Sequence, residues 1–136
     1  MGYRSEVFAA VAGSKTALEA LIQFIKPFSS EAEQEIFSYF KLVKTEENSW
    51  LFAFYDTSIK WYKESENVWY AIRNCARDFG FSYVFYRLGD DIEDTEADEY
   101  CADKTKEFYH RLINSVSFNR SIILDERVQS AFENQQ

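Results

Sequence analysis

The chain has 136 residues, of which 46% are hydrophobic and 18% are aromatic, and its formal net charge is −8 at pH 7. This length and apolar content are typical of a single domain with one core. The charge argues against direct nucleic-acid binding, because proteins that bind phosphate backbones gain affinity from cationic surfaces. Basic protein surfaces are the favoured partners.

The sequence also restricts the cellular compartment. No apolar run approaches the roughly 18 residues needed to cross a bilayer, and the opening residues lack the apolar stretch of a signal peptide. Two cysteines, Cys75 and Cys101, are too few for a disulfide framework or a thiolate metal cage. We therefore expect a cytoplasmic protein with no membrane association.

The first part of the chain predicts a strand followed by two helices. Residues 3–11 alternate loosely between apolar and polar types, as a strand does. Ser14 can cap the next helix, and Ser30 with Glu33 has the spacing of a capping box for another helix over about 31–39. The apolar residues of the earlier helix recur at helical spacing, namely Ala17, Leu18, Leu21, Ile22 and Ile25.

The central part predicts a hairpin, a helix and a strand. Two β-prone runs, at about 40–45 and 50–59, flank a short polar loop. An apolar stripe at helical spacing then covers 65–79, and Gly80 stands where a left-handed residue ends a helix. The aromatic run 81–88 predicts the next strand.

The segment 90–99 contains seven carboxylates in ten residues. No core element tolerates this density, so we expect a solvated loop that leads into a helix start. A helix over 104–113 and a last strand over 117–124 follow, which gives one domain over 1–124 and a polar C-terminal tail over 125–136. The carboxylates are Asp90, Asp91, Glu93, Asp94, Glu96, Asp98 and Glu99.

This order of elements predicts an α+β fold. It contains the split β-α-β motif of ferredoxin-like folds, with an antiparallel sheet, helices on one face, and an appended helix and strand. The strands near 50 and 81 carry apolar residues on both faces. The second sheet face therefore needs a partner or a second copy in a homodimer, a cover from the appended elements, or a ligand.

No pattern in the sequence predicts catalysis. The run 13–16 lacks the glycine spacing of a phosphate-binding loop and is better explained as a capped helix start, and 90–99 lacks the internal glycine of a calcium loop. His110 forms no recognised signature with either cysteine, and Cys75 lies on an apolar stripe where thiols are inert. We expect no catalytic residue, no metal site and no cofactor.

Two short segments carry a resemblance. Residues 2–7 (Gly-Tyr-Arg-Ser-Glu-Val), together with 86–94 (Tyr-Arg-Leu-Gly-Asp-Asp-Ile-Glu-Asp), resemble small uncharacterised proteins encoded by phages and prophages. This resemblance implies a phage accessory protein, and such small acidic proteins often block host defence systems, including CRISPR complexes and restriction enzymes. It assigns no functional residue.

The leading hypothesis is a non-enzymatic inhibitor that binds a host defence or nucleic-acid-handling complex. The carboxylates of 90–99 would steer a basic protein surface, and aromatic residues, Trp50 and Tyr83 among them, would anchor it. The alternative is a small-ligand, nucleotide-like binding or sequestering protein with a site at a subunit interface. A nucleotide-like ligand is an anion, so binding it would need a cluster of arginines from the set Arg4, Arg73, Arg77 and Arg120.

Overall fold

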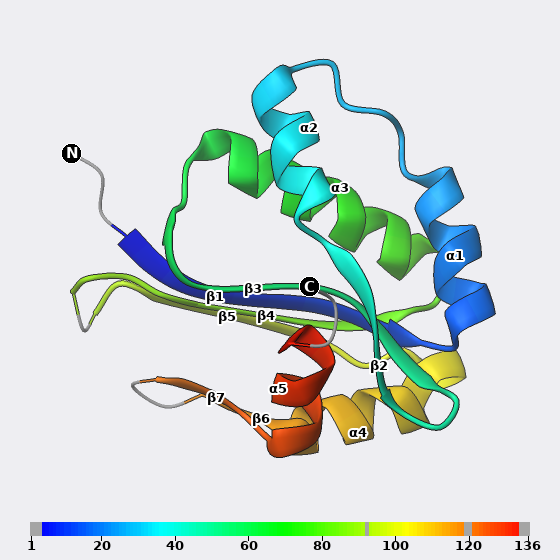
Figure 1. Ribbon diagram of the computed structural model, residues 1–136. Coiled ribbons are helices and arrows are strands. Elements are labelled where there is room, and N and C mark those ends of the chain that lie inside the picture. Colours follow the sequence, from blue (N-terminus) through cyan, green and yellow to red (C-terminus); the bar gives the residue numbers. More distant parts are fainter. Residues whose placement is uncertain (1–3, 92, 119–120, 134–136) are drawn as a thin grey trace.

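The computed structural model describes residues 4–91, 93–118 and 121–133 (Figure 1). The α+β class predicted from the sequence is confirmed. One antiparallel sheet has the strand order β2-β3-β1-β4-β5. Its strands are β1 (Arg4–Gly13), β2 (Lys41–Glu46), β3 (Ser49–Lys60), β4 (Ser82–Leu88) and β5 (Thr95–Tyr100).

Helices lie on both faces of this sheet. On one face are α1 (Lys15–Phe24), α2 (Glu31–Ser38) and α3 (Lys63–Asp78). On the other face, after a short 3₁₀ turn η1 (Asp103–Thr105), are α4 (Lys106–Ser115), the small hairpin β6 (Val116–Phe118) and β7 (Ile122–Leu124), and α5 (Glu126–Glu133). Figure 1 shows the sheet between these two layers.

The capping residues identified in the sequence act as predicted. The Ser14 hydroxyl accepts a hydrogen bond from the Ala17 N–H at 3.3 Å, and the Ser30 hydroxyl accepts one from the Glu33 N–H at 3.0 Å. Gly80 follows α3 with φ of 79°, the left-handed conformation that glycine adopts without steric cost. These local signals mark the starts of α1 and α2 and the end of α3.

The sheet is buried on both sides because its strands alternate between two apolar cores. Under α1, α2 and α3, residues such as Trp69 and Phe85 pack together, and each is at most 4% exposed. On the opposite face, Phe8 and Val84 pack against Val128 and other residues of the C-terminal elements. A strand covered on both faces reads as continuously apolar, as β1 does from position 7 to 12.

The second sheet face is covered by the chain itself. Of the three covers considered above, the intramolecular one is observed, because α4, the β6–β7 hairpin and α5 pack on this face (Figure 1). Covering it therefore requires neither a second subunit nor a ligand. The expectation that helices cover only one face, apart from a single appended helix and strand, is wrong.

Two predictions for the C-terminal part are also wrong. The expected strand over 117–124 is a pair of short antiparallel strands, β6 and β7, and residues 119–120 between them lie outside the described residues. The expected polar tail contains α5, whose Val128 and Ala131 are 1% and 7% exposed. These two residues are three positions apart, so they lie on one helical face and are buried together.

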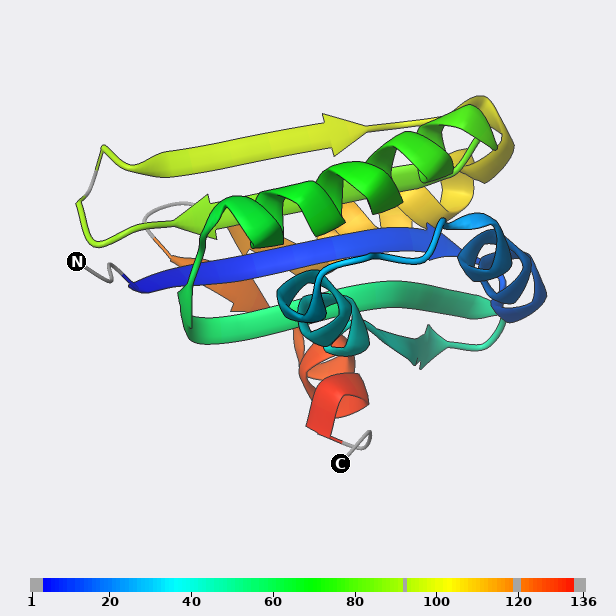
Figure 2. The ribbon, with the colours of Figure 1, turned by 90° about the horizontal axis from the view of Figure 1, so that it is seen from above.

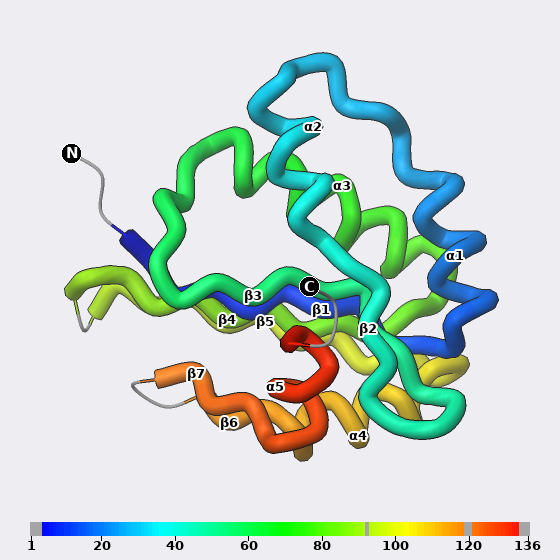
Figure 3. Tube along the Cα trace, viewed as in Figure 1, coloured from blue at the N-terminus to red at the C-terminus, as the bar shows by residue number. Residues whose placement is uncertain are grey.

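The acidic segment can be placed relative to the ends and edges of the sheet. Figure 2 shows α3 running along the sheet, with β5 at one edge and β2 at the other. The trace in Figure 3 places the turn between β4 and β5 at the same end of the sheet as the start of β1. The pairing of Glu6 with Leu88 agrees with this placement. The turn of the acidic segment therefore lies at one corner of the molecule, and β5 continues from it along one edge of the sheet (Figure 2).

Candidate functional site

The acidic segment consists of a turn and an edge strand. Residues 95–100 form β5, which pairs with β4 from Tyr83–Tyr100 to Leu88–Thr95. The predicted loop leading into a helix start is therefore wrong for this half of the segment. Backbone pairing with β4 makes it a strand, although its own residues show no apolar alternation. We call β4, β5 and the turn over 89–94 the acidic hairpin.

Arg87 holds the two arms of the acidic hairpin together. Its Nη2 and Nη1 donate to the two carboxylate oxygens of Asp94 at 2.5 and 3.2 Å, and its Nε donates to Glu96 at 2.7 Å. Nη1 also donates to the hydroxyl of Ser5 on β1 at 3.1 Å. The Arg87 side chain is only 12% exposed, so its charge is shielded from water and matched by two carboxylates.

The ionisation of this cluster follows from its geometry. Burial alone would lower the pKa of Arg87, but the hydrogen bonds to Asp94 and Glu96 outweigh burial and raise it. The hydrogen bonds from Arg87 hold the pKa of Asp94 below its ordinary value. Both partners are therefore charged at neutral pH.

Gly89 permits the close approach on which this clamp depends. A Cβ atom at position 89 would overlap the Asp94 carboxylate. The Gly89 N–H also donates to the Asp94 carbonyl at 2.7 Å, which closes the turn. The glycine in the Leu-Gly-Asp-Asp run is thus required by contact with a side chain, and any larger residue there would displace Asp94 from Arg87.

Each face of β5 is attached to the helix that lies on that side. Asp98 points toward α3 and accepts from Arg73 Nη1 at 3.1 Å. Glu99 points to the opposite face and accepts from the Tyr109 hydroxyl of α4 at 3.1 Å. Burial, with this hydrogen bond, raises the pKa of Tyr109 to about 12. Four of the seven predicted carboxylates therefore have structural partners within the chain.

The other three carboxylates lie on the turn and face solvent. Asp90, Asp91 and Glu93 are exposed, and within the described residues none of them forms an ion pair. Among the described residues, the one hydrogen bond of their side chains is local, because an Asp91 carboxylate oxygen accepts from the Glu93 N–H at 3.2 Å. Ile92 of the same turn lies outside the described residues, as do Gly2 and Tyr3. These three charges are available to a partner.

Tyr83 is not a surface residue, so its prediction as a partner anchor is wrong. It is 0% exposed, because it lies on an inner strand and its side chain points toward the core under α1, α2 and α3. Its ring lies edge-on to Trp69 with centroids 5.7 Å apart, and it stacks on Tyr100 at 5.5 Å. The hydroxyl accepts from Arg77 Nη2 at 3.0 Å. Tyr83 is a core residue.

Trp50 is half-buried and lies far along the sheet from the acidic turn. It pairs with Gly13, at the opposite end of β1 from Glu6. The Lys15 ammonium lies 5.0 Å from its ring centroid. The structure therefore does not bring Trp50 together with the exposed carboxylates in one site.

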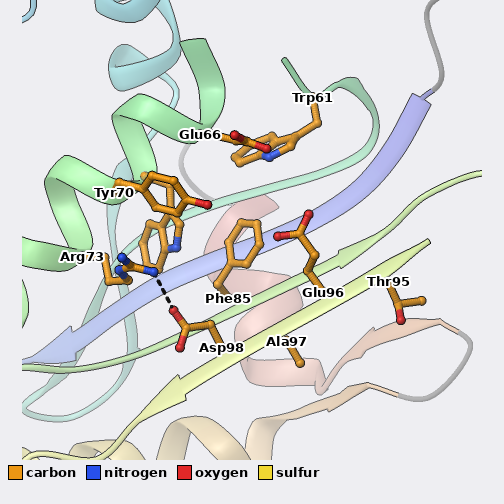
Figure 4. Close-up of a pocket in the computed structure, with 10 residues that line it drawn as sticks. Trp61, Glu66, Tyr70, Arg73, Phe85, Thr95, Glu96, Ala97 and Asp98 are labelled. Carbon is orange, nitrogen blue, oxygen red and sulfur yellow. Dashed lines mark hydrogen bonds and ion pairs between the residues drawn. The ribbon is translucent and has the colours of Figure 1, made fainter. Parts of the chain in front are cut away.

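A pocket of about 470 Å³ between α3 and β5 was not predicted from the sequence (Figure 4). Its aromatic lining comes from Trp61, Trp69, Tyr70 and Phe85. The available signal was the recurrence of Glu66, Trp69, Tyr70 and Arg73 at helical spacing, which places these residues along one side of α3. The opposite wall is formed by residues 95–98 of β5, so the pocket adjoins the acidic hairpin.

A second, more open pocket of about 610 Å³ lies where β3 extends beyond β2. It does not collect the arginines proposed above for anion binding. Arg4 lines it, whereas Arg73 and Arg77 belong to α3 and Arg120 lies outside the described residues. Its charged residues have both signs, namely Arg4, Lys41, Lys60, Asp56 and Glu64.

No protein-family model, curated protein or solved structure matches this chain significantly.

The residues considered for catalysis are not brought together. Within the described residues, no hydrogen bond joins His110 to a cysteine, and the imidazole lies beside the ring of Tyr109. Burial raises the pKa of the half-buried Cys75 thiol, and Cys101 is exposed. In the same part of the chain, no group of three or more His, Cys, Asp or Glu residues is arranged to hold a metal ion.

No described helix is both long and apolar enough to span a membrane.

Proposed function

We propose that this protein is a non-enzymatic binding protein that recognises a basic surface on another protein through its acidic hairpin. The observation that carries this proposal is that four of the seven carboxylates have partners within the chain, whereas the other three form no ion pair within the described residues. Arg87, Arg73 and Tyr109 bind Asp94, Glu96, Asp98 and Glu99 and fix the hairpin. Asp90, Asp91 and Glu93 then remain exposed at its tip.

Such an arrangement favours binding because the charges are held in place before the partner arrives. Ordering a flexible acidic loop on binding would cost conformational entropy, and a hairpin that is already fixed avoids much of that cost. The net charge of −8 adds long-range attraction toward cationic surfaces. An array of carboxylates of this kind can occupy a basic groove that otherwise binds a phosphate backbone.

The resemblance of residues 2–7 and 86–94 to proteins of phages and prophages gives this binding activity a biological context. We infer a phage-encoded accessory protein that acts in the host cytoplasm and inhibits a defence or nucleic-acid-handling complex. The favoured partners are the cationic nucleic-acid grooves of such complexes, and the protein itself does not bind nucleic acid.

The test is recovery of host proteins from a bacterial lysate by the immobilised full-length chain at low and high salt. Replacement of the tip carboxylates by Asp90→Asn, Asp91→Asn and Glu93→Gln is expected to abolish recovery of the specific partner. High salt should weaken recovery of that partner by the wild-type chain, because exposed charges are screened.

A matched control removes the same net charge elsewhere. Glu19→Gln, Glu47→Gln and Glu107→Gln change three exposed carboxylates on α1, the β2–β3 turn and α4. This variant should recover the partner as well as the wild type does. Equal recovery by the tip variant, or equal loss in both variants, would remove the acidic hairpin as the recognition surface.

For the fold, we propose a ferredoxin-like arrangement formed by β1 to β4 with α1, α2 and α3. The order β4-β1-β3-β2, with all neighbours antiparallel, supports this assignment. In this view β5 extends the sheet at one edge, and the elements from α4 to α5 are additions that cover the second face.

The small-ligand alternative has weaker support. In the open pocket beside β3, the cations Arg4, Lys41 and Lys60 are offset by Asp56 and Glu64, so the field there does not single out an anion. A subunit interface was expected because the second sheet face needed a cover. The chain itself covers that face, so this reason for a site between subunits no longer applies.

A further inference from the structure

We propose that the pocket between α3 and β5 binds an arginine side chain of the basic partner. This inference rests on the proposed function, since it names the group by which the partner would be anchored beside the acidic hairpin. The pocket volume of about 470 Å³ is within the range of small-molecule sites and accommodates a single long side chain.

The walls of the pocket suit a flat cation. Trp69 and Phe85 are 1% and 4% exposed and stack on each other. The more exposed rings of the lining, Trp61 and Tyr70, are the ones that can attract a cation through their quadrupoles. Figure 4 shows Trp61 and Glu66 at one end of the pocket, Arg73 and Asp98 at the other, and Phe85 between them. The two ends therefore repeat the same combination of an aromatic ring and a carboxylate.

The end that contains Arg73 shows how this combination holds a guanidinium. The Arg73 guanidinium carbon lies 4.6 Å from the centroid of the Tyr70 ring, and its Nη1 donates to Asp98 at 3.1 Å. At the other end, Trp61 and Glu66 have the same chemistry, but within the described residues no cation pairs with Glu66. That end is where the partner's guanidinium would bind.

The charges of the lining also favour a cation. Three carboxylates, Glu66, Glu96 and Asp98, face one guanidinium, that of Arg73. Asp98 is neutralised by Arg73, and Glu96 shares Arg87 with Asp94. A negative excess therefore remains in the half of the pocket that contains Glu66.

Trp61 adds a reason to expect a peptide. Its indole Nε1–H is buried and has no acceptor within the described residues, although a buried donor is normally satisfied. An arginine in a peptide brings backbone carbonyls as well as a guanidinium. Because the Trp61 nitrogen has less than 1 Å² of accessible surface, such a carbonyl accepts from it only when the indole turns toward the pocket. Arginine fits better than lysine because a planar guanidinium stacks on rings and bonds a carboxylate with two N–H groups.

The experiment uses the full-length chain and three blocked tripeptides, N-acetyl-Gly-X-Gly-amide, in which X is arginine, citrulline or lysine. Citrulline has nearly the shape of arginine and no charge. Binding is followed by tryptophan fluorescence and by the NMR resonance of the Trp61 indole N–H. We expect the arginine peptide to bind at least about tenfold more tightly than the other two and to shift the indole resonance.

Two variants connect this binding to the pocket. Glu66→Gln preserves shape and should weaken the arginine peptide by about tenfold, and Trp61→Phe keeps a ring but removes the N–H and should also weaken it. The control Glu107→Gln removes an exposed charge on the opposite face of the sheet and should leave binding unchanged. Circular dichroism confirms that each variant is folded.

Several results would overturn the assignment. These are equal binding of the citrulline or lysine peptide, absence of binding of the arginine peptide at millimolar concentration, or unchanged binding by Glu66→Gln. If the peptide fails to bind while the Asp90, Asp91 and Glu93 variant still loses its partner, the pocket assignment falls and the acidic hairpin stands. If the peptide binds but that variant keeps its partner, the proposed recognition surface falls instead.

Discussion

At the scale of single residues, Arg87 neutralises part of the acidic segment and ties its turn to β5 and β1. Seven carboxylates in ten residues repel one another, and in isolation they would favour an extended, solvated loop. The Arg87 guanidinium bonds Asp94, Glu96 and Ser5, so it joins the turn, β5 and β1 at one point. One cation thereby converts part of a repulsive run into an ordered hairpin.

Replacing this cation should destabilise the whole domain. In Arg87→Gln, Asp94 and Glu96 would lose their partner and would remain close to each other as like charges. We expect the free energy of unfolding to fall by about 2 kcal/mol, a value between those of exposed and buried ion pairs. Urea denaturation measures this change, and amide hydrogen exchange should show faster exchange in β5.

The control for this variant is Arg127→Gln. Arg127 is 59% exposed, and its contacts to Glu46 and Asp125 are longer, at 3.4 and 3.5 Å. Its loss should change stability by no more than about 0.5 kcal/mol. If both substitutions had the same small effect, Arg87 would not hold the hairpin together.

Acid should weaken the same contact. Because Arg87 holds the pKa of Asp94 below its ordinary value of 3.8, Asp94 stabilises the fold fully above the pKa of the unfolded chain, at about pH 4. This contribution is lost as the pH falls through the lower pKa of the folded state. We expect Asp94→Asn to be less stable than the wild type at neutral pH and equally stable in strong acid. Urea denaturation at several pH values tests this, and a difference independent of pH would contradict it.

At the scale of elements, α5 seals the second core although it lies at the end of the chain. Val128 is 1% exposed and packs in the cluster that contains Phe8 and Val84. Val128→Ala should lower the free energy of unfolding by about 2 kcal/mol, because it leaves a cavity in this core. The neighbouring exposed residue gives the control, since Gln129→Ala should change it by no more than about 0.5 kcal/mol. Equal values from denaturant unfolding would mean that the segment behaves as a tail.

The elements that could be predicted from the sequence are those with a strong local signal. The helices α1, α2 and α3 have apolar stripes, and Ser14, Ser30 and Gly80 mark their ends. By contrast, β5 consists of exposed and half-exposed residues, so its strand character depends on pairing with β4. A strand stabilised mainly by backbone pairing with its neighbour leaves no apolar period in its own sequence.

The candidate site could be predicted only as a segment of chain. The exposure of Asp90, Asp91 and Glu93 to solvent follows directly from their charge and from the polar residues around them in the sequence. The internal pairs of Asp94 and Asp98 depend on Arg87 and Arg73, which the fold brings close to them. Tyr83 shows the same limitation, because its burial depends on which helices pack against β4.

At the scale of the whole molecule, two apolar cores enclose one sheet, and the acidic hairpin occupies one edge and one corner of that sheet. Burial on both faces gives β1 and β4 a rigid setting, and the acidic hairpin and the pocket beside α3 extend from it. A site fixed to a sheet in this way is positioned more precisely than one on a free loop. The acidic hairpin therefore combines fixed charges with the ring-lined pocket beside α3.

The acidic character of β5 also bears on how copies of the protein meet at high concentration. An outermost strand leaves backbone groups unpaired on its free side, and such strands are the usual starting point for fibril growth. Here the strand carries Glu96, Asp98 and Glu99, so the same strand of an approaching copy would place like charges in register. Edge-to-edge pairing of copies through this strand is thereby opposed.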